Sequence, residues 1–350
     1  MSAGHASTSP VLTHRRVVVS RRGGPDVLQV VEESLPEPGP GEARVKVLAA
    51  GVSGYDLMAR SHWFPGSPRP PFTLGEDIVG LVDAIGEGVS TVEPGQRVAA
   101  WTFGAGGGYA ESICRPASQL VAVPPVLDPV DAVCVVVNYL PAHLYLHRTA
   151  AVQNGERILV HGAAGGVGTA LLQLGRLAGL ELYGTASCYN HELVASLGAT
   201  PVDYRSEDFG KRVRSLTGDG VDAVFDLIGG ARHLWRSYRV LRPGGRLVMM
   251  GSVAASRRGM LSIPPSLLVI GLVRLIPDGR HAPMSPNMTD YPFSHAAWYR
   301  DTLTELLDLA AAGRIRPVVA ERIPIVEAAR AHERLERGGY AGKVVLVSTS

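Results

Sequence analysis

Cysteine is scarce in this 350-residue chain, which contains only Cys114, Cys134 and Cys188. Their odd number, their wide spacing and the lack of a C-x-x-C pair argue against a disulfide framework and against a structural zinc cluster. We therefore expect the protein to work in a reducing compartment, the cytoplasm.

An excess of charge of one sign is also lacking, because 34 basic residues face 32 acidic ones and the formal net charge is +2. Such a chain has no global field with which to hold a nucleic acid or an anionic membrane. Met1–Pro10 is polar where a secretory signal needs an apolar core, and Leu268–Ile276 is too short to cross a bilayer. We interpret the first as a disordered lead-in and the second as a buried or interface segment, and we expect small-molecule partners.

What the chain does contain is ample apolar surface, with 46% hydrophobic residues, enough for two domains. Between Arg16 and Pro125, short β-rich runs separated by glycine and proline predict a compact, strand-dominated domain. The stretch from Asp128 to Ala151 is typical of a helix, with Asp128 and Pro129 as its start signal.

From Glu156 onward, predicted strands and helices alternate, which indicates a parallel, doubly wound sheet and an α/β fold. The alternation breaks after Gly251. It resumes with a predicted helix from Arg300 to Ala312 and a final strand with the sequence KVVLV.

The strongest local signal is Arg157–Gly168, an apolar strand that enters a glycine-rich turn and then a helix. Gly165 allows the main chain to approach a pyrophosphate, Gly168 allows the helix to pack closely on the strand, and the helix N-terminus offers unpaired N–H groups. Ala163 stands where the usual fingerprint has its first glycine. A tight turn without a ligand is the alternative. We favour a dinucleotide site, with these residues as its phosphate-binding part: Ala164, Gly165, Gly166, Val167 and Gly168.

The choice of cofactor is expected at the end of the next strand, LELYGTAS, where no acid follows. An aspartate or glutamate there would bind the ribose 2′-hydroxyl of NAD and repel the extra phosphate of NADP. Ser187 and Asn190 can instead donate hydrogen bonds to that phosphate, which favours NADPH. Tyr204 and Arg205 could add a hydroxyl and a cation, although simple packing of Tyr204 is an equal alternative.

Taken together, these segments resemble the medium-chain dehydrogenase/reductase superfamily. Within it, they are most similar to the zinc-independent branch of quinone oxidoreductases and their vesicle amine transport protein-like relatives. The resemblance runs from about Arg16 to Val347. It rests on GVSGYDLMAR, PFTLGEDIVGLVDAIGEGV, PGQRVAA, GGYAE, VNYLPA, VHGAAGGVGTALLQLGRLAG, VDAVFDLIGG, LRPGGRLV and AGKVVL.

The resemblance implies a GroES-like β-rich substrate domain and a Rossmann domain, with the active-site cleft between them. We expect residues 1–13 to be a lead-in, residues 14–133 to form the substrate domain completed by 300–350, and residues 134–299 to form the NADPH-binding domain. It also implies a homodimer, and it adds three residues to the cofactor site: Ile228, Gly251 and Lys343.

The resemblance also allows a metal to be judged residue by residue. In the zinc-using alcohol dehydrogenases a cysteine three residues before an aspartate binds the catalytic zinc, and here Ser53 stands three residues before Asp56. The zinc-binding histidine of those enzymes corresponds to Glu76, and their lobe with four cysteines is missing. Without thiolate and imidazole ligands we expect no metal.

A reductase without zinc suits substrates whose own conjugation spreads the charge that hydride delivers, so the protein supplies positioning and a proton. Tyr55 is the first candidate for the proton donor or for a hydrogen bond to the substrate oxygen, with packing under its loop as the alternative. Asp56 more often orders such a loop than titrates. The expected catalytic set, implied by the resemblance, is Tyr55, Ser53, Asp56, Asn138 and Tyr139.

Three functional hypotheses remain open at this point. The leading one is an NADPH-dependent reductase of quinones or α,β-unsaturated carbonyl compounds. The second is a trans-acting enoyl-thioester reductase, which uses the same hydride geometry. The third is an NADPH-binding protein with low turnover that acts through partners.

Overall fold

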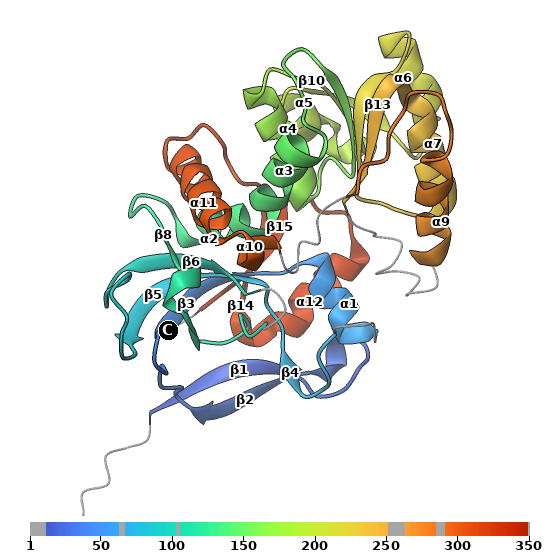
Figure 1. Cartoon of the computed structure of the whole chain (residues 1–350). Coiled ribbons are helices and arrows are strands. Elements are labelled where there is room, and N and C mark those ends of the chain that lie inside the picture. Colours follow the sequence, from blue (N-terminus) through green and yellow to red (C-terminus); the bar gives the residue numbers. More distant parts are fainter. Residues whose placement is uncertain (1–11, 63–66, 103–105, 251–262, 285–290, 349–350) are drawn as a thin grey trace, which may run out of the picture.

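The structure is a computed structural model that describes residues 12–62, 67–102, 106–250, 263–284 and 291–348. Gly251 and most of the expected lead-in lie outside these ranges. Within them the strands form three sheets. Figure 1 shows a β-rich part and a part in which helices cover both faces of a parallel sheet. This arrangement confirms the predicted α/β fold.

The larger β-rich sheet has the order β14-β15-β3-β5-β6-β8, with β7 also paired to β3. Burial alternates along β3, as expected for a strand with one face on a core. A second sheet, β2-β1-β4, closes the same core from below in Figure 1. The strands are β1 (Thr13–Val19), β2 (Leu28–Ser34), β3 (Glu42–Gly51), β4 (Phe72–Thr73), β5 (Asp77–Ile85), β6 (Arg97–Trp101), β7 (Ser112–Pro116), β8 (Val121–Ala122), β14 (Val319–Pro324) and β15 (Lys343–Val347).

The C-terminal end of the chain returns to this N-terminal sheet. Strand β15 is the predicted KVVLV strand, and it pairs antiparallel with β3, with Val345 opposite Gly51. Helix α12 (Ala328–Arg337) lies beside α1 (Gly54–Ser61) in Figure 1. The two helices are joined by Arg60, whose Nη1 lies 3.1 Å from Nδ1 of His332.

The parallel sheet has five strands in the order β11-β10-β9-β12-β13. Strands β9 and β12 are almost wholly buried, because helices pack on both faces of the sheet. In Figure 1, α4 and α5 cover one face and α6, α7 and α9 the other. The elements are β9 (Arg157–His161), β10 (Glu181–Ala186), β11 (Ala199–Asp203), β12 (Val221–Asp226), β13 (Leu241–Met249), α4 (Gly166–Leu177), α5 (His191–Ser196), α6 (Phe209–Thr217), α7 (Ala231–Val240) and α9 (Ile263–Val273).

A long helical segment connects the two parts. It runs through α2 (Pro129–Cys134) and α3 (Leu140–Leu144), each followed by a π-helical turn. The Asp128 side chain accepts a 2.8 Å hydrogen bond from the amide of Val130, which confirms the predicted start signal. The segment Pro129–Thr149 is long and apolar enough to cross a membrane by length and composition. Its most apolar window is 78% buried within the molecule, as in the core helix of a globular protein.

Helix α9 is apolar on nearly every side, but only part of it is covered. It packs against α7, with Ile270 and Val273 buried. Four leucines in and directly after α9 are exposed: Leu267, Leu268, Leu272 and Leu275. The expected burial of this stretch is therefore met by only one side of the helix. Towards the C-terminus, α10 (Tyr291–Ser294) and α11 (Ala296–Ala311) precede β14, and α11 covers the predicted helix from Arg300 to Ala312.

Candidate functional site

The glycine-rich turn stands at the carboxyl end of β9, where ligands bind in open α/β sheets. Gly165 is the N-cap of α4 and provides no capping side chain, so the first amides of this 12-residue helix are left to a ligand. The amide of Gly342 donates a 2.8 Å hydrogen bond to the carbonyl of Ala164. The turn is thereby tied to the segment that leads into β15 of the other sheet.

Two glycines of this turn have no room for a side chain. A Cβ on Gly168 would lie 2.2 Å from the carbonyl oxygen of Gly162, which is the close packing of helix and strand that we predicted. A Cβ on Gly166 would lie 2.7 Å from Nδ2 of Asn138. The structure therefore places the Asn138 amide directly against the glycine-rich turn.

The expected 2′-phosphate site gathers side chains from the ends of β10 and β11. The hydroxyl of Ser187 lies 3.2 Å from that of Tyr204. The guanidinium of Arg205 lies 5.6 Å from the ring centre of Tyr189 and 5.9 Å from that of Tyr204. Asn190 ends the short turn after Ser187. Two hydroxyls and a cation thus lie together where an acid would have indicated NAD, and Asn190 lies at the end of the adjacent turn.

The end of β12 reaches the same edge of the sheet. Ile228 follows β12, and its Cδ1 lies 3.6 Å from the place that a Cβ on Gly162 would occupy. The Asp226 carboxylate holds this bend by accepting hydrogen bonds of 2.9 Å from the amides of Ile228 and Gly229. The structure therefore brings Ile228 beside the glycine-rich turn.

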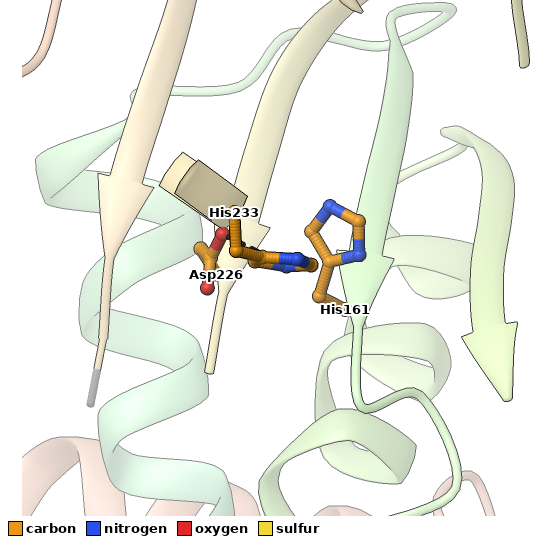
Figure 2. A group of neighbouring side chains, drawn as sticks. All are labelled: His161, Asp226 and His233. Atoms are coloured by element: carbon orange, nitrogen blue, oxygen red, sulfur yellow. Dashed lines mark ion pairs between the residues drawn. The ribbon is translucent and has the colours of Figure 1, made fainter. Parts of the chain in front are cut away.

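Beneath this edge lies a polar cluster that sequence reasoning missed. Figure 2 shows His161 at the end of β9, Asp226 at the end of β12 and His233 on α7. Nε2 of His161 lies 3.1 Å from the Ser237 hydroxyl, which donates a 2.9 Å hydrogen bond to Asp226. Nδ1 of His161 lies 3.0 Å from the Thr185 hydroxyl. Burial lowers the pKa of His161 to about 3, so the ring is neutral and both nitrogens are engaged.

This cluster is the candidate metal group among the described residues, because its ligand atoms lie within 4.8 Å of one another. A metal there would have to displace the hydroxyls of Thr185 and Ser237 from His161. The existing hydrogen bonds already satisfy the ring. The cluster therefore connects the ends of β9, β10 and β12 and supports the cofactor edge from below.

The expected catalytic loop begins α1. Ser53 is the N-cap, and its side chain accepts a 3.2 Å hydrogen bond from the amide of Asp56. The Asp56 carboxylate accepts hydrogen bonds from the amides of Ser53 at 2.8 Å and Gly75 at 3.0 Å. As expected, Asp56 orders the loop.

Next to this loop is a small recess. Among the described residues it is lined by Tyr55, Asp56, Pro68, Phe72, Thr73, Leu74, Gly75, Glu76 and Gly106. Its polar groups come from the start of α1 and from the turn before β5. Burial raises the pKa of Tyr55 to about 12, so the phenol stays protonated and can donate a hydrogen bond.

Glu76 is the residue of this recess to which sequence reasoning gave no active role. Its Oε2 accepts a 2.5 Å hydrogen bond from the Ser53 hydroxyl. Glu76 is only 4% exposed. Burial, and to a smaller extent the Asp56 carboxylate, raises the pKa of Glu76 well above the usual range. An acidic pair inside the otherwise apolar run TLGEDIVG is the signal that could have revealed it.

Lys343 is connected to the acids of this region. Its Nζ lies 2.8 Å from the carboxylate of Asp77, the residue after Glu76, and both side chains are buried. Asp77 raises the pKa of Lys343 in spite of the burial, so the ammonium is charged. The Lys343 side chain thus pairs with an acid of the β-rich part. Its main chain comes directly after Gly342, which is hydrogen-bonded to the glycine-rich turn.

Tyr139 is fully buried in the core formed by the connecting helix, and the structure does not bring it to the recess. Its neighbour Asn138 lies instead at the glycine-rich turn. The two residues follow one another in a π-helical turn, so their side chains point in different directions.

The positions that correspond to zinc ligands do not fit a zinc ion. Ser53 and Glu76 are in direct contact, so the two positions do meet at one point. However, they offer a hydroxyl and a carboxyl group that bind one another, in place of the thiolate and imidazole that zinc prefers.

Comparison with known proteins matches both halves of the chain. Residues 39–125 match the alcohol dehydrogenase GroES-like domain, and residues 197–346 match the zinc-binding dehydrogenase family. The quinone oxidoreductase of Lama guanicoe is 32% identical over 95% of this chain and 97% of its own length. The synaptic vesicle membrane protein VAT-1 homolog of Homo sapiens is 30% identical over 95% of this chain and 86% of its own length.

Solved structures give the same result. A mycobacterial protein in complex with NADPH has a TM-score of 0.83 at 30% identity, covering 95% of this chain and 99% of that one. The quinone oxidoreductase of Pseudomonas syringae pv. Tomato DC3000 has a TM-score of 0.82 at 29% identity, with the same coverage. The fold and the site thus define a class of protein: a two-domain α/β oxidoreductase that binds a dinucleotide at one edge of its parallel sheet. The chain belongs to the medium-chain dehydrogenase/reductase superfamily, in its branch of quinone oxidoreductases and VAT-1 homologs.

Proposed function

We propose that this chain is a zinc-free, NADPH-dependent reductase that passes a hydride to a quinone or to an α,β-unsaturated carbonyl compound. Its cofactor is NADPH, the ligand of the mycobacterial relative. The observation that carries the zinc-free part is the contact between Ser53 and Glu76, because the two positions that hold metal ligands in zinc-using relatives here bind each other. Without a Lewis acid, the acceptor must spread the incoming charge over its own conjugated bonds.

The described residues fit NADPH. The amides at the start of α4 are suited to its pyrophosphate, since the N-cap Gly165 has no side chain to cap them. Ser187, Asn190 and Tyr204 are suited to its 2′-phosphate. When bound, NADPH supplies the hydride and the protein supplies position and a proton. Ile228 and Asn138 border the same edge.

In the recess, the Tyr55 phenol orients the acceptor by donating a hydrogen bond to its oxygen. Asp56 holds the loop that carries Tyr55. The apolar lining by Phe72 and Leu74 suits a flat, conjugated substrate.

Steady-state oxidation of NADPH with a quinone, an enone and a crotonyl thioester tests this proposal. Turnover with the quinone or the enone supports it. Turnover confined to the thioester would instead assign an enoyl-thioester reductase. Tight NADPH binding with no turnover on any acceptor would assign a binding protein that acts through partners.

We also propose that the chain forms a homodimer and works in the cytoplasm. The exposed leucines of α9, including Leu268 and Leu272, support a second copy as the partner of that face. The free thiols of all three cysteines support a reducing compartment. The variant Leu268→Glu should lower the sedimentation coefficient to that of a monomer, and an unchanged coefficient would place any dimer contact elsewhere.

A further inference from the structure

The two oxygens of the Glu76 carboxyl group differ in their hydrogen bonding. Oε2 accepts the hydrogen bond from Ser53, whereas Oε1 is buried without a hydrogen-bond partner among the described residues. An unsatisfied buried oxygen costs free energy, so such an atom in a folded protein calls for an explanation, for instance a role in catalysis. The side chain lines the recess together with Tyr55 and Phe72. Glu76 therefore faces the space in which the acceptor is expected.

The charged groups around Glu76 keep a proton on it. Two of these groups are carboxyl groups like Glu76: Asp56 at the start of α1 and Asp77 at the start of β5. The cation Lys343 on β15 is already paired with Asp77. Burial and these two carboxylates raise the pKa of Glu76, while the Ser53 hydrogen bond and Lys343 oppose the shift.

Asp56 differs from Glu76 because its carboxylate is well supported. It accepts two main-chain hydrogen bonds, and burial raises its pKa only to about 6. Of the two carboxyl groups, Asp56 therefore has the better supported charge, and Glu76 is the one on which burial and the Asp56 carboxylate favour a proton.

We propose that the Glu76 carboxyl group is the catalytic acid that protonates the reduced acceptor, and that Ser53 is the residue that positions it. This inference rests on the proposed reductase function and adds the proton donor to it. It differs from the initial expectation, in which Tyr55 was the first candidate.

Acidity decides between the two residues. Burial raises the pKa of Tyr55 to about 12, which makes its phenol a poor donor near neutral pH. A carboxyl group is by its nature far more acidic than a phenol, so one that burial keeps neutral transfers its proton more readily. Tyr55 then orients the acceptor oxygen, and Glu76 completes the reaction.

The step balances without a further reactant. Once the acceptor has gained a hydride and carries a negative charge, the O–H bond of Glu76 breaks and the proton forms a new bond to the acceptor. Glu76 remains as a carboxylate, and the product leaves neutral. The carboxylate then regains a proton from water through the recess, which returns the site to its starting state.

The test compares Glu76→Gln with Ser53→Ala, Ser53→Thr and the control Glu111→Gln. Glutamine keeps the size of Glu76 and an oxygen for the Ser53 hydroxyl but carries no acidic proton. Glu111 is a part-buried carboxylate of the same β-rich region that pairs with Arg15, outside the recess. For an enone, Glu76→Gln should lower kcat about 10²-fold or more, whereas Glu111→Gln should leave it unchanged.

The pH profile gives a readout that a structural role would not move. Wild-type kcat should fall as the pH rises through the pKa of Glu76, and this fall should be absent in Glu76→Gln. Ser53→Ala should move the fall in kcat to higher pH, because it removes a hydrogen bond that favours the Glu76 carboxylate. Ser53→Thr keeps a hydroxyl and should return the fall to its wild-type pH.

Infrared spectroscopy of the protein without NADPH tests the same point without turnover. Wild type should show the carbonyl band of a protonated carboxyl group at neutral pH, and Glu76→Gln should lose that band. If the wild type is active and Glu76→Gln shows the same rate and the same pH profile, this inference alone is overturned. A wild-type protein that reduces no acceptor would overturn the proposed function and the inference together.

Discussion

The hydroxyl of Ser53 donates a 2.5 Å hydrogen bond to the carboxyl group of Glu76, 23 residues further along the chain. These are the two positions that correspond to metal ligands in the zinc-using relatives. The hydrogen bond joins the start of α1 to the turn before β5, and we propose that it takes the place of a shared metal. In the proposed reaction, the choice of substrate and the transfer of the proton both depend on this contact.

Gly168→Ala should weaken the protein and its binding of NADPH. The new Cβ would meet the Gly162 carbonyl at 2.2 Å, so strand and helix must separate at a cost of about 1–3 kcal/mol. Gly271→Ala in α9 is the matched control, because its Cβ would meet nothing within 4 Å and alanine favours a helix. Urea unfolding and NADPH titration measure both effects. Equal stability of the two variants would contradict the close packing.

Arg205→Ala should weaken NADPH binding about tenfold and leave NADH binding unchanged, because only NADPH carries the 2′-phosphate. The guanidinium stacks on Tyr189 and Tyr204 beside Ser187. Arg212→Ala removes a nearby exposed arginine that pairs with Glu207, and it should change neither affinity. The two affinities can be measured by titration calorimetry. A wild-type preference for NADH would contradict the assignment of this site.

Lys343→Met should destabilise the protein by about 3–5 kcal/mol, because it leaves the Asp77 carboxylate buried without its cation. The double variant Asp77→Asn/Lys343→Met removes both charges and should recover most of that loss. Urea midpoints for the two single variants and the double variant give the coupling. If the double variant were no more stable than Lys343→Met, the ion pair would not be the cause.

His161 makes stability depend on pH. Its pKa is about 3 in the folded protein and 6.5 in a free chain, so between these values only the unfolded chain binds the proton. Stability therefore falls as the pH drops below 6.5, by about 1.4 kcal/mol per pH unit for this one group. His161→Gln should reduce the slope by that amount, while His295→Gln, at an exposed position, should not. Equal slopes for wild type and His161→Gln would contradict a buried neutral ring.

Much of the fold could be predicted because its signals are local. Asp128 and Pro129 marked the start of the connecting helix, and Gly168 marked the close contact of strand and helix. The site was harder, because it is made by contacts between distant segments. Glu76 stood out only as a missing zinc ligand until the structure placed it against Ser53 and Asp56. Likewise, the neighbours Asn138 and Tyr139 looked alike in sequence, and only the π-helical turn separates their directions.

Helix α9 shows a second reason why the sequence alone was insufficient: it does not say what covers an apolar helix. An apolar run such as LLVIGLV is compatible with burial inside one chain and with burial between two chains, since both remove it from water. The exposure of its three leucines, and of Leu275 after it, became visible only when α7 was seen to cover just one side of the helix.

The most direct test of the central claim is NADPH oxidation by the wild-type protein after exhaustive treatment with a metal chelator, with a quinone and an enone as acceptors and metal content measured on the same sample. The account predicts full activity with less than stoichiometric zinc, and no gain when zinc is added back. Activity that disappears with the metal and returns with zinc would contradict it.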